Sequence, residues 1–526
     1  MSTFDVLGEV GLPAPVSELA ARRWDVVVVG GGHNGLTAAA YLAGAGKSVL
    51  VLERRERLGG ACTLERPFSD SRFVVSPCAY LVGMLDPRVI ADLDLARHGY
   101  EAVVTDPAQW TPFDDGTSLT EWRDGARTAA EVARLAPGDV DGFLAYDELF
   151  IRIRDRLRDP AADAWDGDAP TRAEIEARFA DDPEAREVVL EASIADIVER
   201  HVRDERLRNA LHGQGTIGTF AGPREAGTAW IHAHHRLGLL GGWGYVVGGM
   251  GRVSFCIADA AVEAGAIVAA GVPVAAVVPG EGVRLEGGET VRAAAVVSNA
   301  DPKRLLAMCD GDVPDAFRSR VDAWCSESPV VKLNCALARL PTFIATPDGP
   351  EHVYRSQVVV TGTIDDTQAA CESARQGEPQ PSFCEIYFQT PYDPSVAPPG
   401  THAMSVFAQY APYTLADRDW DARRDEIGDR VLATIARFAP DVVTCVTDRQ
   451  VLGPPDVEAQ IGLTGGHIFQ GECLPDQMWE RRFAPRTPIP GVYLCGAATH
   501  PGGSVIGTNG RNAARVVLAD LGTDGV

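Results

Sequence analysis

The chain has few basic residues for its length, and this shortage limits its possible partners. It carries 48 lysines and arginines against 73 aspartates and glutamates in 526 residues, a formal net charge of −25. A surface of that sign repels the phosphate backbone of nucleic acids, so we expect no nucleic-acid partner. It also disfavours general adhesion to anionic membranes, although a local basic patch would still allow peripheral membrane contact.

The sequence also lacks the marks of secreted, membrane-spanning and disulfide-bonded proteins. The first 23 residues have neither a basic start nor an uninterrupted apolar stretch. No uncharged apolar run reaches the roughly 18 residues that a membrane-spanning helix needs. The eleven cysteines are scattered and form no Cys-x-x-Cys pair, which indicates free thiols in a reducing compartment. We therefore expect a cytoplasmic protein in which residues 1–23 form an N-terminal tail.

The sequence does contain a glycine-rich loop between a predicted strand and a predicted helix. Residues 26–29 are a β-branched run typical of a strand buried on both faces, and residues 36–45 are rich in helix formers. A second apolar run, 49–52, ends on Glu53, so the segment predicts one strand–helix–strand unit. The loop has the G-x-G-x-x-G spacing of dinucleotide-binding proteins and reads Gly30-Gly31-Gly32-His33-Asn34-Gly35.

The loop residues suit the binding of a dinucleotide. Gly30 permits a tight turn, Gly32 lets the backbone approach a pyrophosphate, and Gly35 lets helix and strand pack closely. Free N–H groups at the helix start favour the negative charge of a diphosphate. Glu53 would accept hydrogen bonds from a ribose diol and repel a 2′-phosphate, which disfavours NADP. A glycine-rich turn in an ordinary α/β domain is the alternative interpretation.

Several further segments resemble the FAD enzymes of the amine oxidase and phytoene desaturase superfamily. The Leu-Gly-Gly of RRERLGGAC, at 58–60, resembles their extended fingerprint. The C-terminal GVYLCGAATHPGGSVIGTNGRNAARVVLAD predicts a strand, a glycine-rich turn and a helix suited to a flavin. With GHIFQGECLPDQMWERRF, GGWGYVVGGMG, SPVVKLNCAL and VVSNADP, it resembles the bacterial phytoene desaturase-related group named after pyridine nucleotide-disulphide oxidoreductase domain-containing protein 2.

The resemblance runs from about Trp24 to Leu521 and implies an α/β fold, in which a Rossmann-type FAD-binding domain carries an inserted α+β substrate domain. The FAD domain is expected at 24–95, 240–305 and 455–526, and the substrate domain at 96–239 and 306–454. FAD should be bound noncovalently, because no cysteine or histidine lies in a known linkage motif. The cofactor-binding residues expected are Gly30, Gly31, Gly32, His33, Asn34, Gly35, Glu53, Arg54, Gly59, Gly60, Val274, Gly496, Val505, Ile506 and Gly507.

The candidate catalytic residues are Lys332, His467 and His500. In related flavin amine oxidases a lysine holds a water against the flavin N5, and the resemblance suggests Lys332 for that role. A lysine at a strand edge that points to solvent is the alternative. His467, where the family pattern has Asn, and His500 lie in loops expected near the flavin and could transfer a proton near neutral pH. His500 could instead shape the cofactor loop.

A histidine cluster in the middle of the chain suggests a substrate cavity rather than a metal site. His232, His234 and His235 do not share one helix face, and no carboxylate or cysteine lies at ligand spacing, so no metal is expected. The surrounding HAHHRLGLLGGWGY matches the related group. The resemblance therefore places His234, His235 and Trp243 at the substrate.

The function that these features imply is desaturation of an apolar small molecule, with a hydride passing to flavin N5 and electrons leaving to oxygen or a quinone. Amine or amino-acid oxidation on the same fold is a second hypothesis, and release of hydrogen peroxide with amines would identify it. A third is a binding protein like the Rab GDP-dissociation inhibitors, which share this fold and bind prenylated partners without flavin. The intact Glu53 and the pair Gly59-Gly60 favour a retained cofactor.

The sequence gives less support to two other functions, disulphide reduction and hydrolysis. A disulphide reductase would need a redox cysteine pair and a second G-x-G-x-x-G loop for NADPH, and the sequence has neither. No Ser-His-Asp order or paired carboxylate motif points to hydrolysis. The oligomeric state stays open.

Overall fold

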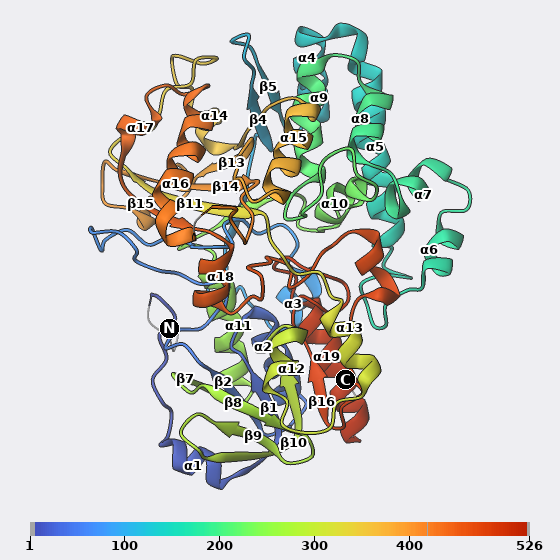
Figure 1. Ribbon diagram of the computed structural model, residues 1–526, viewed down its shortest axis with the longest axis vertical. Helices are drawn as coiled ribbons and strands as arrows, with labels where there is room; N and C mark the ends of the chain where they lie inside the picture. The colour runs from blue at the N-terminus through green and yellow to red at the C-terminus, as the bar shows by residue number, and fades with distance from the viewer. Residues whose placement is uncertain (1–5, 418, 523–526) are drawn as a thin grey trace.

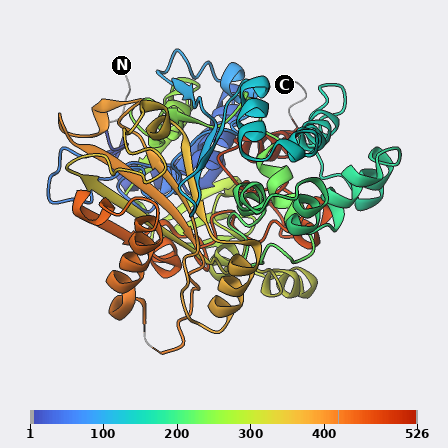
Figure 2. The same ribbon diagram turned by 90° about the horizontal axis from the view of Figure 1, so that it is seen from above.

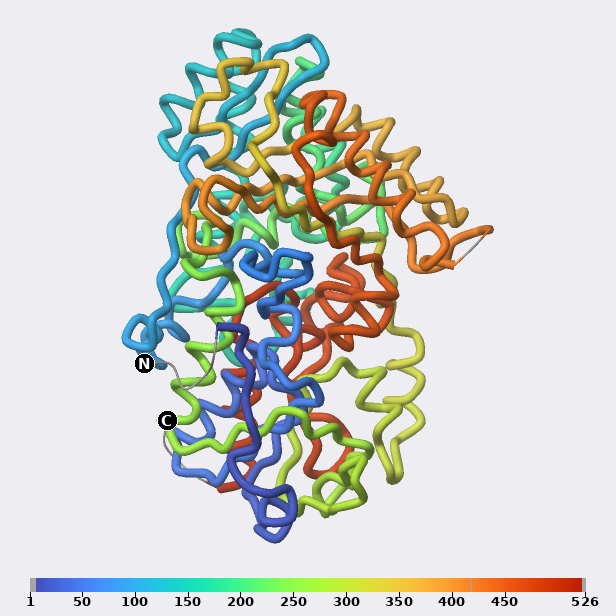
Figure 3. Tube along the Cα trace, turned by 90° about the vertical axis from the view of Figure 1, so that its left-hand side faces the viewer, coloured from blue at the N-terminus to red at the C-terminus, as the bar shows by residue number. Residues whose placement is uncertain are grey.

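The computed structural model describes residues 6–417 and 419–522, which form two stacked halves, each built around one large sheet (Figure 1). The chain passes between the halves several times, so each half is assembled from segments far apart in the sequence (Figure 3). This arrangement confirms the predicted mixed α/β fold. Within the described ranges, no helix is both long and apolar enough to cross a bilayer.

The first sheet lies in the lower half of Figure 1 and consists of parallel strands extended by an antiparallel hairpin. Strand β1 runs parallel to β2 and β10, and β10 also pairs in parallel with β16. In spatial order the strands are β7 (Ile267–Ala270), β2 (Val49–Glu53), β1 (Arg23–Val29), β10 (Thr290–Ser298), β9 (Gly282–Leu285) and β8 (Val274–Val278), with β16 (Val492–Leu494) beside β10.

Helices cover one face of this sheet and explain why its strands are apolar on both sides. Helix α2 (His33–Gly44) packs between α11 (Gly251–Glu263) and α19 (Thr508–Leu521), and these helices share one core with β1 and β2. The other face, to which the β8–β9 hairpin also contributes apolar side chains, packs against α12 (Pro302–Met308) and α13 (Asp315–Asp322). This is the Rossmann-type arrangement predicted from the glycine loop.

The ends of the predicted segments differ from the structure at two places. The described part of 1–23 is packed on the first sheet instead of forming a tail: α1 (Val16–Ala21) buries Leu19, whose carbonyl accepts a 3.0 Å hydrogen bond from the Trp24 indole. The boundary expected at 305/306 falls inside α12, and α13 packs Phe317 on the first sheet. All three helices bury only one or two residues, so their apolar pattern is weak in the sequence.

The second sheet is mostly antiparallel and forms the upper half. Helices α14 (Glu351–Arg355), α16 (Trp420–Ala436) and α17 (Val442–Cys445) cover its outer face with an apolar core. In spatial order its strands are β15 (Val446–Leu452), β11 (Val330–Leu337), β14 (His402–Gln409), β13 (Phe383–Phe388), β12 (Gln357–Thr361), β4 (Gln109–Pro112) and β5 (Ser118–Glu121).

A group of helices packs beside the second sheet, as the view from above shows (Figure 2), and its core includes Val359 and Phe383 of that sheet. Its core includes residues of the C-terminal loops, Phe469 and Ile506 among them. The helices are α4 (Gly125–Leu135), α5 (Val140–Leu157), α6 (Arg172–Arg178), α7 (Pro183–Leu190), α8 (Ile194–His201), α9 (Glu205–His212) and α10 (Thr228–His235), with α15 (Ile364–Arg375) against α9. The remaining elements are α3 (Pro87–Asp92), α18 (Pro454–Ile461) and the small sheet of β3 (Ala102–Val104) and β6 (Gly244–Val246).

A buried ion pair joins this helical group to the half that contains the first sheet. Arg158, the residue that ends α5, donates to Asp86 over 3.1 Å, and both side chains are almost fully buried. The Thr508 hydroxyl, at the start of α19, donates to the same carboxylate over 3.1 Å. Asp86 therefore fixes the helical group against the N-terminus of α19.

Gly35 offers a direct test of the packing between α2 and β1. A Cβ at this position would lie 2.3 Å from the Gly30 carbonyl oxygen, so Gly35→Ala forces backbone atoms apart. We expect a loss of about 1–3 kcal/mol in the free energy of unfolding, measured by denaturant titration. Gly44→Ala, in the last turn of the same helix, meets nothing within 4 Å and should stabilise by about 0.5–1 kcal/mol. Equal effects at both positions would contradict this packing.

Candidate functional site

One cavity of about 390 Å³ connects the glycine loop of the first half with the second sheet. Gly30, Gly32 and Glu53 lie at one end, and Lys332 and Phe407 lie at the other. A volume of this size is typical of small-molecule and cofactor sites. The site is therefore shared by the two halves, and each sheet contributes one end of it.

The glycine loop holds the carboxylate of Glu53 in place at the end of β2. Gly31 donates its N–H to Glu53 Oε2 over 2.8 Å, and Arg55 donates its N–H to Oε1 over 2.9 Å. Glu53 is only 7% exposed, and it still lines the cavity. A carboxylate oxygen has about two acceptor sites, so each oxygen can still accept from a ribose hydroxyl.

The residues at this end fit the FAD that the sequence predicts. No side chain caps the N-terminus of α2, where the N-cap is Gly32, so its first N–H groups are free to meet a diphosphate. His33 Nε2 and Asn34 Oδ1 are buried without a hydrogen-bond partner among the described residues, although both side chains line the cavity. Burial lowers the pKa of His33 to about 4, so the ring is neutral and offers hydrogen bonds rather than charge.

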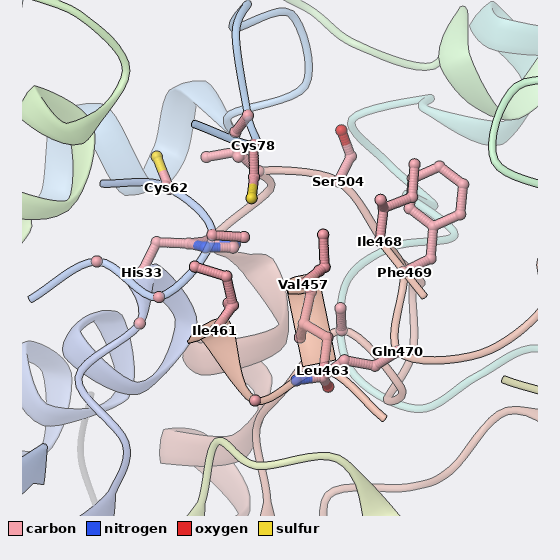
Figure 4. A pocket seen from close by; sticks show the side chains of 18 of the residues that line it. His33, Cys62, Cys78, Val457, Ile461, Leu463, Ile468, Phe469, Gln470 and Ser504 are labelled. Atoms are coloured by element: carbon pink, nitrogen blue, oxygen red, sulfur yellow. The ribbon is translucent and has the colours of Figure 1, made fainter. Parts of the chain in front are cut away.

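Figure 4 shows this end of the cavity from close by. His33 and Cys78 lie on one side, and Ile468 and Phe469 lie on the other. Ser504, which has the unusual φ of 100°, also lines this cavity. Its backbone also hydrogen-bonds with His33, so the N-terminal glycine loop and the C-terminal loop meet here.

Most of the expected cofactor-binding residues lie on the cavity wall. Sequence reasoning did not single out Asn299, Arg304 and Ser504, which line it as well. Asn299 lies in VVSNADP, directly after β10, so its position at a carboxyl strand end was the available signal. The expected residues on the wall are Gly30, Gly32, His33, Asn34, Glu53, Arg54, Gly59, Gly60, Val274 and Val505.

Other expected residues lie behind the wall and shape it through packing. A Cβ on Gly496 would lie 2.3 Å from Gln470 Oε1, so this glycine lets the 470 loop approach β16. Gly507, with φ of 80°, forms the N-cap of α19, and Ile506 is fully buried beside it. The residues placed behind the wall are Gly31, Gly35, Gly496, Ile506 and Gly507.

At the other end of the cavity, the pairing of strands in the second sheet brings several polar side chains onto its inner face. Lys332 of β11 and Glu385 of β13 both pair with Phe407 of β14, so the three side chains share one face. Tyr387 follows two positions after Glu385 and faces the same way. All four residues line the cavity. The sheet thus turns a row of polar side chains toward the site instead of toward solvent.

Lys332 is buried and has polar but no anionic direct partners. It is 4% exposed, and its Nζ donates to Ser405 Oγ and, over 3.3 Å, to Asn334 Oδ1. The Nζ also lies 4.5 Å from the centre of the Tyr80 ring. Burial lowers the pKa of Lys332 to about 7, despite the opposing field of Glu385. The structure therefore excludes the solvent-facing alternative for this lysine.

Glu385 is the centre of the polar row and was not singled out from the sequence. Its Oε1 accepts from Gln357 Nε2 over 2.6 Å and from Gln214 Nε2 over 3.1 Å. Its Oε2 accepts from the hydroxyls of Tyr387 over 2.7 Å and Tyr80 over 3.3 Å. Burial raises the pKa of Glu385, while these donors and Lys332 oppose the shift. The available signal was a lone carboxylate within the apolar run FCEIYF.

We name the six polar residues of this region the polar wall. They come from the three strands β11, β12 and β13, from a 3-10 turn at 213–215 and from the loop at Tyr80, and each lines the cavity. An apolar surface continues from them along Trp243, Ile217, Phe407, Ile468 and Phe469. The polar wall consists of Tyr80, Gln214, Lys332, Gln357, Glu385 and Tyr387.

The expected histidines divide between the cavity and the protein interior. His235 and Trp243 line the cavity, and their ring centres lie 6.1 Å apart. His234 does not line it, because its Nε2 hydrogen-bonds over 3.1 Å with the Gly503 carbonyl beneath the C-terminal loop. His234 therefore does not contact the cavity as expected, and instead it supports the C-terminal loop.

The structure does not place His467 or His500 on the cavity wall, so it gives no support to proton transfer by them. His467 lies between two lining residues and is fully buried, and burial lowers its pKa to about 3. His500 Nε2 hydrogen-bonds over 2.7 Å with the Ala164 carbonyl, and its pKa is lowered by burial to about 4. Both rings are neutral packing groups near the cofactor loops.

Metal and thiol chemistry find no support in the described part of the chain. Across residues 6–417 and 419–522, no group of three or more histidine, cysteine or acidic side chains could hold a metal ion. Cys62 and Cys78 line the cavity, but burial raises the pKa of each thiol to about 12, so neither is a thiolate at neutral pH.

Comparison with known proteins places these features in a family. A family described as flavin containing amine oxidoreductase matches residues 35–518. The chain is 35% identical over 549 aligned residues to pyridine nucleotide-disulfide oxidoreductase domain-containing protein 2 of Mus musculus, covering 95% of this chain and 94% of the mouse protein. The resemblance inferred from the sequence motifs is thereby confirmed.

More distant similarities extend to a desaturase and to an amine oxidase. The chain is 26% identical to a neurosporene-forming phytoene desaturase of Rhodobacter capsulatus, covering 91% of this chain and 90% of that enzyme. A solved structure of putrescine oxidase bound to putrescine superposes with a TM-score of 0.61 at 18% identity, covering 95% of this chain and 99% of the oxidase. At that identity the superposition shows a shared fold.

Proposed function

We propose, because this chain belongs to the family of flavin-containing amine oxidoreductases, that it dehydrogenates a largely apolar small molecule beside its flavin. FAD is its cofactor, and oxidoreduction is its class of reaction. The single observation that carries the proposal is the continuous cavity, which links the residues that fit FAD with a mostly apolar chamber. A chamber that opens directly onto the cofactor end suits transfer between a bound substrate and the flavin.

The chain's own residues have distinct roles in this proposal. The first N–H groups of α2 hold the diphosphate, and Glu53 accepts from the ribose hydroxyls. When bound, the flavin supplies an acceptor for a hydride. Phe469 and Trp243 help to exclude water and position the apolar body of the substrate. Lys332 holds a water or accepts the proton that the substrate loses, because its neutral amine is well populated near pH 7.

Electrons then leave the reduced protein for oxygen or a quinone in this proposal. The eleven cysteines are all free, and the two that line the cavity are held as thiols, which disfavours a disulfide as the acceptor.

The proposal is tested by anaerobic reduction of the purified holoprotein. We expect polyenes, cyclic terpenes or fatty acyl compounds to bleach the visible absorbance of the flavin, and chromatography of the product to show one new double bond. Primary and secondary amines form the second arm of the panel. Bleaching by amines alone, followed by hydrogen peroxide release in air, would replace desaturation by amine oxidation. A protein that takes up no FAD would contradict both.

A further inference from the structure

The polar wall is larger than a purely hydrocarbon substrate would need. Six polar side chains line one end of an otherwise apolar cavity, and four of them are at least nine-tenths buried. Burial of polar groups costs free energy unless they are hydrogen-bonded. A hydrocarbon placed against this wall would cover hydrogen-bonding atoms without replacing the bonds that water makes to them.

The hydrogen bonds within the wall leave defined atoms for a ligand. Gln214 and Gln357 both give their amide nitrogens to Glu385, over 3.1 Å and 2.6 Å. The amide oxygen of each glutamine is then the group left to accept a hydrogen bond. Two of the three N–H groups of protonated Lys332 meet Ser405 and Asn334, which leaves one for the cavity. The wall thus offers acceptors and one donor side by side.

The charges of the wall cancel without a ligand. Glu385 on β13 and Lys332 on β11 lie in one row on either side of Phe407 of β14, and each acts on the other's pKa in the direction that favours its charged form. Among the described residues that line the cavity, the other charged side chains are Glu53, Arg54 and Arg304, at the glycine-loop end. A ligand with an ammonium or carboxylate group would add a third charge that finds no counterion here.

We infer that the substrate carries one uncharged hydrogen-bonding group, a hydroxyl or a carboxamide, which binds between Glu385, Gln214 and Gln357. Its apolar body then lies along Trp243 and Phe469. The inference rests on the proposed function, because it names the substrate class of the same cavity. It separates this chain's substrate from a pure hydrocarbon and from a cationic amine.

The test compares four probes with one carbon skeleton: octane, octanol, octylamine and octanoate. Each is titrated into the oxidised holoprotein, and binding is followed by the change in the flavin absorbance spectrum. We expect octanol to bind at least about tenfold more tightly than each of the other three, which corresponds to about 1.4 kcal/mol. Equal affinity for all four, or tightest binding of octane, would overturn the inference.

Two variants test the charge balance in opposite directions. Glu385→Gln leaves the Lys332 cation unpaired and should shift the preference toward octanoate by about tenfold. Lys332→Met leaves the carboxyl group unpaired and should shift it toward octylamine by a similar factor. Glu351→Gln, on the exposed side of α14, is the matched control and should change neither ratio. Parallel loss of affinity for all four probes in both variants would show a merely structural role and overturn the inference.

The outcomes separate this inference from the proposed function. If the holoprotein's flavin is reduced by a substrate of the panel but the four probes bind equally, the head-group inference alone fails. If octanol is selected but no compound reduces the flavin, the proposed dehydrogenation alone fails. The flavin content of each variant, measured after heat release, shows whether a change in binding arises from loss of the cofactor.

Discussion

Replacing Lys332 by methionine is expected to slow anaerobic flavin reduction by about 10²–10⁴-fold, the usual contribution of general acid–base catalysis. Methionine has a similar length and suits the buried position, but it cannot hold a water or accept a proton. Lys332 is one of only three lysines in the chain, and it is 4% exposed. The rate is measured by stopped-flow absorbance with the best substrate of the panel. The flavin content should stay unchanged.

The pH dependence of this rate provides a second readout for Lys332. Burial lowers its pKa from the ordinary value to about 7, so the neutral amine, which is the active form of a base, becomes populated as the pH rises through that value. The reduction rate should therefore rise with pH around 7 and reach a plateau above it. Glu385, Tyr80 and Tyr387 lie in the same site, and burial raises the pKa of each of them. A second transition in the pH profile of the rate would therefore reflect the titration of one of these three groups.

The controls for this prediction are simple. Lys47→Met removes a partly exposed lysine just before β2 and should leave both the rate and its pH profile unchanged. In Lys332→Met the transition near pH 7 should disappear. A variant that keeps the wild-type rate and profile would remove Lys332 from the chemistry and leave it as a packing residue.

Replacing Glu53 by glutamine is expected to raise the dissociation constant of FAD by about tenfold to a hundredfold. The charged carboxylate accepts from the N–H groups of Gly31 and Arg55, and it is the group placed to accept from the ribose. A hydrogen bond to a charged group is worth about 1.5–3 kcal/mol, and glutamine has only one acceptor oxygen. The dissociation constant is measured by the fluorescence of FAD released on dilution.

Glu56→Gln is the matched control for this effect. Glu56 lies three positions further along the same segment and is exposed, so its replacement should leave FAD affinity within experimental error. If both variants retain FAD equally, the glycine loop and Glu53 do not hold the ribose as described.

The nucleotide-binding half could be predicted from the sequence because its signals are local. The run 26–29, the glycine loop and Glu53 lie within one short segment, and the structure gives β1, α2 and β2 there. Helix and strand periods together with glycine chemistry suffice when the interacting residues are close in sequence.

The polar wall could not be predicted in the same way. Lys332 and Glu385 are 53 positions apart in numbering, and only the pairing of both with Phe407 brings them to one face. In a strand, alternating polar residues normally predict a solvent-facing side. Here the outer face of the second sheet is apolar and covered by α16, so the polar side faces the cavity. That inversion follows from the long-range topology.

The histidines illustrate the same limit. His467 and His500 lie in loops near the site, as expected, but a loop position does not determine which way a side chain points. Gly466 and Ile468 reach the cavity wall, and the His467 ring between them packs inward. His500 is held by the Ala164 carbonyl of the helical group, a contact between segments 336 positions apart.

The central claim is that FAD lies along this one cavity, with its diphosphate at the start of α2 and its ring system toward the polar wall. A crystal structure of the purified protein with FAD tests this most directly. The account predicts density for the diphosphate at the N–H groups after Gly32, the ribose on Glu53 and the isoalloxazine ring within reach of Lys332. A cavity filled by side chains, or a nicotinamide dinucleotide on the glycine loop with no flavin nearby, would contradict it.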